Sequence, residues 1–136
     1  MLKDIPRVAV EDIAIAVIPQ ENSDENGEAL WEVYLLNLKE KTIDNVLVAS
    51  KGYGPYKGET VKTSTLRHFL GTIEGHQYML VEPIQDNVFG LNNEYWVSFY
   101  IDKEVFDKKY IFLPETITQE YFTMIPLLNK RGVMIR

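Results

Sequence analysis

The chain has 136 residues, of which 46% are hydrophobic and 25% are charged, a composition typical of one globular domain and not of a disordered chain. Fourteen basic against twenty acidic residues give a net charge of -6, which argues against generic duplex nucleic-acid or anionic-membrane binding, because both need an attraction to phosphate. The absence of cysteine excludes disulfides and cysteine-based metal sites, and it favours a reducing compartment.

The first half of the chain reads as strands separated by polar or glycine-rich segments. Residues 8–17 form a first extended apolar run, which Pro19 ends, and residues 20–28 form an acidic loop. Residues 30–38 are apolar on both sides, which predicts a central strand. Residues 46–51 predict a third strand, and residues 52–58, with three glycines and a proline, predict a loop.

The second half continues the same pattern. Residues 59–70 predict a half-polar edge strand, and residues 76–84 predict another strand that Pro83 closes. Residues 85–93 predict an irregular loop. Two aromatic-rich runs, 94–101 and 105–113, predict a hairpin around three polar residues. Thr118 is placed to cap a short helix over residues 120–125 that Pro126 would stop.

Seven strands with no long helical pattern predict an all-β fold in one domain, residues 1–136. We expect an antiparallel, immunoglobulin-like or fibronectin-III-like β-sandwich with a short C-terminal helical turn. An open β-barrel is the alternative. The N-terminal residues lack the apolar core of a signal peptide, and no run approaches the roughly eighteen apolar residues of a membrane-spanning helix, so we expect a cytoplasmic protein without membrane contact.

One segment differs in charge from the rest of the chain. Four basic residues against Glu59 give residues 51–68 a charge of +3, and aromatic residues and a histidine are interleaved with them. This pattern predicts a contact surface for an acidic protein, a phosphorylated ligand or single-stranded nucleic acid. The other interpretation is a solvent-exposed edge strand whose lysines oppose pairing with the edge of another chain. The candidate residues are Lys51, Tyr53, Tyr56, Lys57, Lys62, Arg67 and His68.

Phe89 is the most apolar feature of the loop at residues 85–93. It either tucks under the end of the sandwich or stays exposed beside Tyr53 and Tyr56, where it would extend the contact surface. We include Phe89 among the candidate surface residues on the second reading.

No motif predicts catalysis or a cofactor. The glycines of residues 52–58 are not followed by a helix, as a phosphate-binding loop requires, and His68 and His76 lack metal-ligand spacing. No Gly-x-Ser-x-Gly motif occurs. The strand glutamates are expected on solvent-facing sides and the two tryptophans in the core; these residues are Glu32, Glu82, Glu94, Trp31 and Trp96.

Several segments resemble a family of small, uncharacterised bacterial proteins: residues 31–38, 43–48, 62–68 and 90–97. Some members carry the label phenylalanyl-tRNA synthetase alpha subunit. The motif residues that such a synthetase needs do not occur here, since Arg67 is followed by His68 and Phe69, and no arginine follows the glycines at 52 and 54 at the matching position. More loosely, the run at residues 70–75 resembles the turn before the fifth strand of immunoglobulin-like modules. The resemblance implies a fold and assigns no catalytic residue.

Together these patterns predict a cytoplasmic, non-enzymatic binding or protein-interaction module that uses no cofactor. The first alternative is a structural or accessory subunit that associates with itself through an exposed sheet edge. The second is a small-molecule enzyme that uses carboxylates, which would require two acidic side chains in an apolar pocket.

Overall fold

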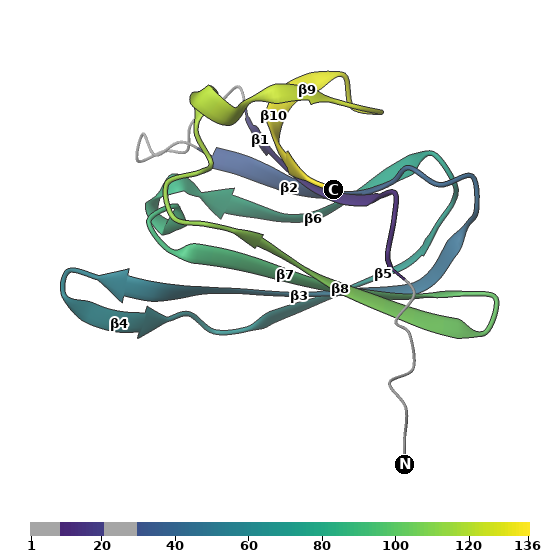
Figure 1. The fold of residues 1–136 in the computed structure, drawn as a ribbon, viewed down its shortest axis with the longest axis horizontal. Coiled ribbons are helices and arrows are strands. Elements are labelled where there is room, and N and C mark those ends of the chain that lie inside the picture. Colours follow the sequence, from purple (N-terminus) through teal and green to yellow (C-terminus); the bar gives the residue numbers. More distant parts are fainter. Residues whose placement is uncertain (1–8, 21–29) are drawn as a thin grey trace, which may run out of the picture.

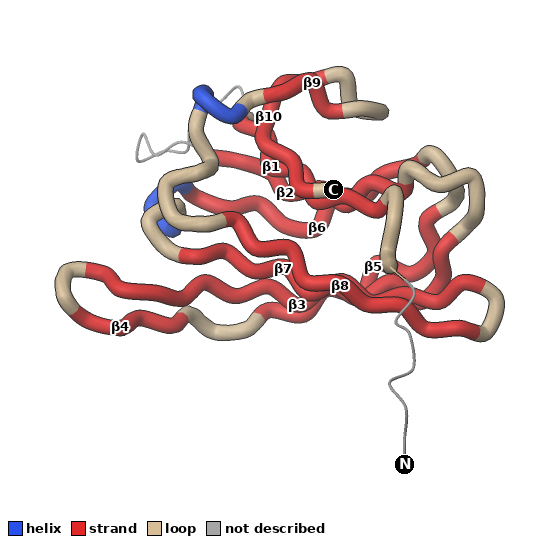
Figure 2. The backbone as a smooth tube through the Cα atoms, in the orientation of Figure 1, coloured by secondary structure: helices blue, strands red, loops and turns tan. Residues whose placement is uncertain are grey.

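The computed structural model describes residues 9–20 and 30–136. Two antiparallel sheets lie face to face, as Figure 1 shows, and strands dominate the backbone in Figure 2. The first sheet has the order β6-β2-β1-β10-β9, with bounds Gln77–Gln85, Leu30–Asn37, Ile13–Pro19, Lys130–Ile135 and Thr123–Ile125. The second has the order β4-β3-β7-β8, with β5 also paired to β3; the bounds are Glu59–Lys62, Ile43–Tyr56, Asn92–Ile101, Glu104–Phe112 and Leu66–Ile73. The expected all-β sandwich is confirmed, and it is not a closed barrel.

The connectivity is that of an immunoglobulin-like sandwich. Strands β1, β2 and β6 share one sheet and β3, β7 and β8 share the other. When β4 and β5, which both pair with β3, are counted together as the fourth strand, these are the first, second and fifth strands of that plan against the third, sixth and seventh. Strands β9 and β10 are an addition to that plan, because β10 pairs with β1 on the side away from β2. They bring the described chain to ten strands instead of the seven that we predicted.

The main core fills the space between the sheets. Its side chains alternate along β1, β2, β3 and β7, and the largest of them are the aromatic rings of Tyr95, Phe99, Tyr110 and Phe112. A second, smaller cluster lies on the other side of the first sheet, where Ala14, Ala16 and Leu36 pack against Ile125. The turn after β9 supplies Leu127 and Leu128 to this cluster, so the C-terminal hairpin covers part of the outer side of the first sheet.

Three local predictions are wrong. Residues 52–58 are not a loop: β3 continues to Tyr56 and turns at Lys57 and Gly58 into β4. The expected helix at residues 120–125 is a single 3-10 turn, η2 (Gln119–Tyr121), followed by β9, and Thr118 makes no side-chain cap. Trp96 is not a core residue, because 45% of its surface is exposed.

The hairpin of β7 and β8 is confirmed, but its turn was predicted over residues 102–104 and occupies residues 102–103, because β8 already begins at Glu104. The loop at residues 85–93 contains a second 3-10 turn, η1 (Asp86–Val88). Within the described ranges, no helix has the length and apolarity to cross a lipid bilayer. The acidic loop predicted at residues 20–28 and the start of the first run, Val8, lie almost wholly outside the described residues.

Candidate functional site

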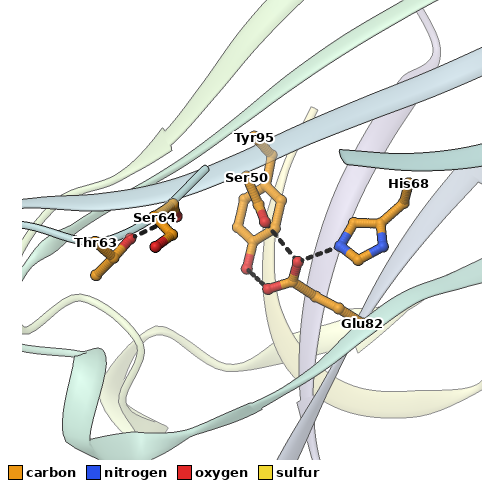
Figure 3. A network of polar contacts seen from close by, with 6 residues as sticks. All are labelled: Ser50, Thr63, Ser64, His68, Glu82 and Tyr95. Carbon is orange, nitrogen blue, oxygen red and sulfur yellow. Dashed lines mark hydrogen bonds and ion pairs between the residues drawn. The ribbon is translucent and has the colours of Figure 1, made fainter. Parts of the chain in front are cut away.

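The first candidate site is a polar network between the two sheets, centred on Glu82 of β6. One carboxylate oxygen, Oε1, accepts hydrogen bonds from Ser50 Oγ at 2.5 Å and from His68 Nε2 at 2.7 Å. The hydroxyl of Tyr95 lies 3.5 Å from the second oxygen, Oε2. Figure 3 shows these side chains converging on Glu82 from β3, β5 and β7. Glu82 is only 9% exposed, so its carboxylate depends on these donors instead of on bulk water.

A β-bulge turns Glu82 inward. The pairing of β2 with β6 shifts between Val33 and Tyr34, so that Val33 lies opposite Glu82 while Tyr34 lies opposite Leu80. Val81 is therefore the extra residue, and the inward side of β6 changes from odd to even positions. Without this shift, strand alternation would have placed Glu82 on the outer side of the sheet.

The network borders an open cavity of about 420 Å³ at one end of the sandwich. Its wall includes residues of both sheets and of the link between β4 and β5, among them Thr63, Ser64, Leu66 and Ile84. Ser50 and His68 bind the same oxygen of Glu82, so the histidine does not stand between the serine and the carboxylate. This is not the order of an acyl-transfer triad, and the arrangement is suited to holding a ligand rather than to relaying a proton from Ser50.

The second candidate site is the outward side of the second sheet. Ser50 points inward to Glu82, so its neighbours Ala49 and Lys51 point outward. Across the strands, Arg67, Ala49, Trp96 and Lys109 form one row of directly opposed residues. Phe69 and Leu47 form the start of the next row, and Lys62 lies opposite Tyr53. We call this surface the basic-aromatic face: Leu47, Lys51, Tyr53, Lys62, Arg67, Phe69, Trp96, Tyr100, Lys109 and Ile111, with three carboxylates in the same rows, Asp44, Glu94 and Asp107.

Cations and exposed rings alternate on the basic-aromatic face. Lys109 Nζ lies 4.8 Å from the ring centroid of Trp96, and Lys51 Nζ lies 5.7 Å from that of Tyr53. Phe69 is 68% exposed, which is unusual for a phenylalanine in a strand. Lys51 also pairs with the buried Glu94, at 3.6 Å between Nζ and Oε2. Within the described ranges, the other three cations of this face have no ion-pair partner.

The structure divides the eight predicted surface residues among four places. Lys51, Tyr53, Lys62 and Arg67 share the basic-aromatic face. Tyr56 and Lys57 lie at the exposed tip of the β3–β4 hairpin, where Lys57 Nζ is 5.4 Å from the Tyr56 ring centroid. His68 points inward to Glu82, on the opposite side of β5 from Arg67.

Phe89 does not belong to the exposed surface. It is 8% exposed and packs edge-on against Trp31, with 5.1 Å between the ring centroids. Its apolar side chain finds a hydrophobic site under the end of the sandwich, which was the first of the two readings of the sequence. Its place in the candidate surface was therefore wrong.

Sequence reasoning missed the partners that complete each site. Glu82 and Glu94 are buried, although both were expected to face solvent. Phe69, Trp96 and Lys109 were not selected, because they lie outside the segment of altered charge or were assigned to the core. A signal did exist for Trp96: it is two residues from Glu94 and Ser98 on a strand whose inward positions already hold Tyr95 and Val97.

Comparisons of the chain with protein-family models, with curated proteins and with solved structures find no match. The resemblance to a bacterial family therefore stays a prediction. Among the described residues, no group of three or more histidine and carboxylate side chains is placed to hold a metal ion.

Proposed function

We propose that this protein is a non-enzymatic binding module whose basic-aromatic face docks an acidic protein partner, and that it acts in the cytoplasm. The observation that carries the proposal is the row of Arg67, Trp96 and Lys109, with Phe69 beside it, on the side of the second sheet that faces away from the core. Tryptophan, aromatic residues and arginine are the types that dominate binding energy at protein interfaces.

Charge favours an acidic partner over a basic one. The chain carries -6 overall, whereas the rows of this face hold four cations, Lys51, Lys62, Arg67 and Lys109, against three carboxylates, Asp44, Glu94 and Asp107, a balance of +1. Complementary charge speeds the encounter with an acidic surface and opposes docking of a basic one. In Figure 1 the described strands of the first sheet all lie on the core side of the second sheet, opposite the basic-aromatic face.

The apolar residues favour a protein over a nucleic acid. Leu47 and Ile111 stand among the aromatic rings and are each 36% exposed. Aliphatic side chains offer no flat ring on which a base can stack, whereas they pack well in the core of a protein interface. A mixed aliphatic and aromatic centre bordered by cations therefore fits an acidic protein better than single-stranded nucleic acid.

The first test is site-specific photocrosslinking in the cells of origin, followed by identification of the captured protein. A benzophenone amino acid at position 69 should capture a protein with an acidic surface, and the same probe at position 78 should not. Tyr78 is the matched position because it is exposed on the outward side of the other sheet. Equal capture at both positions, or capture of nucleic acid alone, would contradict the proposal.

The identified partner is then purified and its affinity is measured by calorimetry against variants. Trp96→Ala should weaken binding by about 2 kcal/mol or more, roughly thirtyfold, because it removes the central ring of the face. Arg67→Glu with Lys109→Glu should also weaken binding and slow association at low salt. Lys130→Glu with Arg131→Glu makes the same charge change on exposed positions of β10 and should leave the affinity unchanged.

A further inference from the structure

The cavity beside Glu82 has the size and chemistry of a small-molecule site. Its volume of about 420 Å³ falls within the usual range for ligand pockets, roughly 300–1,000 Å³. Polar groups line one part and the apolar side chains of Leu66, Ile84 and Val88 line another. This cavity lies between the sheets, and Lys51 is the residue of the basic-aromatic face that also borders it.

One oxygen of Glu82 lacks a full set of donors. A carboxylate offers about four acceptor sites over its two oxygens. In the part of the chain that the structure describes, Oε1 receives two short hydrogen bonds, whereas Oε2 has the Tyr95 hydroxyl at 3.5 Å, which is the outer limit for such a contact. Oε2 therefore has room to accept a further hydrogen bond from a donor in the cavity.

The under-coordinated oxygen faces the polar wall of the cavity. In Figure 3, Oε2 and the Tyr95 hydroxyl lie on the side of Glu82 where Thr63 and Ser64 are found, and His68 lies on the other side. Glu82, Tyr95, Thr63 and Ser64 all border the cavity. A donor in the cavity would therefore meet Oε2 first, with the oxygen of the Tyr95 hydroxyl beside it as a second acceptor.

The number of free acceptor positions selects the kind of donor. A guanidinium binds a carboxylate best through both oxygens at once, and here Ser50 and His68 occupy Oε1. A primary ammonium is a compact charge with three donors that needs only one carboxylate oxygen and can use neighbouring hydroxyls for the rest. The apolar wall then fits a short alkyl or aromatic tail.

We propose that the cavity between β3, β6 and the β4–β5 link binds a primary ammonium group with a short apolar tail, and that Glu82 Oε2 is its anchor. Ser50 and His68 act as positioning residues, because they fix the carboxylate through its other oxygen. Lys51 borders both sites, but the anchor Glu82 is not part of the basic-aromatic face, so either proposal can fail without the other.

The test is a nuclear magnetic resonance titration of the whole chain with 2-phenylethylammonium, its neutral counterpart 2-phenylethanol and 2-phenylethylguanidinium. The ammonium should shift the backbone amides of Leu66 and Ile84 and bind about tenfold tighter than the alcohol, because a hydrogen bond to a charged group is worth that factor or more. The guanidinium should bind more weakly than the ammonium. Equal affinity for the ammonium and the alcohol would overturn the proposal.

Two variants connect the affinity to the residues. Glu82→Gln should remove the tenfold preference for the ammonium, while Glu32→Gln should keep it, because Glu32 bonds Tyr34 on the outer side of β2. If Glu82→Gln fails to fold, Leu66→Trp takes its place: Leu66 is half-exposed at the cavity wall, and the larger ring should block the probe without touching the carboxylate. A tenfold preference that survives in folded Glu82→Gln, or ammonium binding that is unchanged in folded Leu66→Trp, would contradict the proposal.

A primary ammonium can belong to a free amine or to the lysine side chain of a peptide. The titration is therefore repeated with n-butylammonium and with a short peptide that carries one lysine between glycines. Tighter binding of the amine assigns the cavity to a metabolite-sized ligand, and tighter binding of the peptide assigns it to a lysine of a partner chain. Failure of both would overturn the proposal.

Discussion

The hydroxyl group of Tyr110 connects the two sheets through the main core. It donates to the carbonyl oxygen of Ile13 at 2.6 Å, from β8 to β1. We expect Tyr110→Phe to lower the free energy of unfolding at pH 7 by about 1 to 3 kcal/mol, because a buried carbonyl loses its donor. Urea unfolding checks this. Tyr100→Phe, at an exposed position on the neighbouring strand, should change little.

The same hydroxyl gives the stability a pH dependence. Burial raises the pKa of Tyr110, so its contribution is present below the pKa of about 10 in the unfolded chain and is lost as the pH rises above that value. The stabilities of the wild type and Tyr110→Phe should therefore converge in alkaline solution. Burial also raises the pKa of Tyr95, and burial together with Glu32 raises the pKa of Tyr34 to about 12, so part of the alkaline loss should persist in the variant. A difference that stays constant up to pH 11 would contradict the assignment to Tyr110.

Among the elements, the added strand β10 depends on a close approach to β1. A Cβ atom at Gly132 would lie 2.5 Å from the carbonyl oxygen of Val17 and 3.0 Å from Ile18 Cγ1. Gly132→Ala should therefore push β10 away from β1 and lower the free energy of unfolding by about 1 to 3 kcal/mol. Gly90→Ala is the control, because its Cβ would only touch the flexible side chain of Glu115 at 3.5 Å. Thermal unfolding should show a larger loss of stability for Gly132→Ala than for Gly90→Ala. An equal loss in the two variants would contradict the prediction that β10 needs the close approach at Gly132.

The sequence predicted elements well where alternation was unbroken and poorly where it was interrupted. The β7–β8 hairpin was found because its apolar residues alternate on both sides of a polar turn. The glycines at 52 and 54 suggested a loop, yet β3 runs through them: a Cβ at Gly52 would lie 3.3 Å from Thr63 Cγ2, so glycine here permits a close neighbour instead of a turn.

The candidate sites show the same limit. Four of the predicted surface residues, including Lys51 and Arg67, lie on the basic-aromatic face. The positive charge of residues 51–68 within an acidic chain was enough to locate that part of the face. Glu82 was missed because the bulge at Val81 reverses the side on which it lies. A single sequence contains no mark of that bulge, since it arises from how β6 fits against β2.

For the whole molecule, the charge of the basic-aromatic face bears on self-association. Face-to-face pairing of two copies would bring Lys62, Arg67 and Lys109 near their equivalents, and like charges at close range cost free energy. We expect a monomer at micromolar concentration in 50 mM salt, with association increasing as salt screens the face. Sedimentation velocity at low and high salt checks this. A stable dimer at low salt would favour the alternative of a self-associating subunit.

From Leu47 to Gly54, the side chains of strand β3 point alternately away from the core and into the space between the sheets. Exchanging any one residue of this stretch except Lys51, which borders both sites, should therefore impair at most one of the two proposed activities. Deleting or inserting one residue between Val48 and Tyr53 would swap the sides and abolish both together. Evolution of either activity is free to proceed by substitution, but this strand must keep its length.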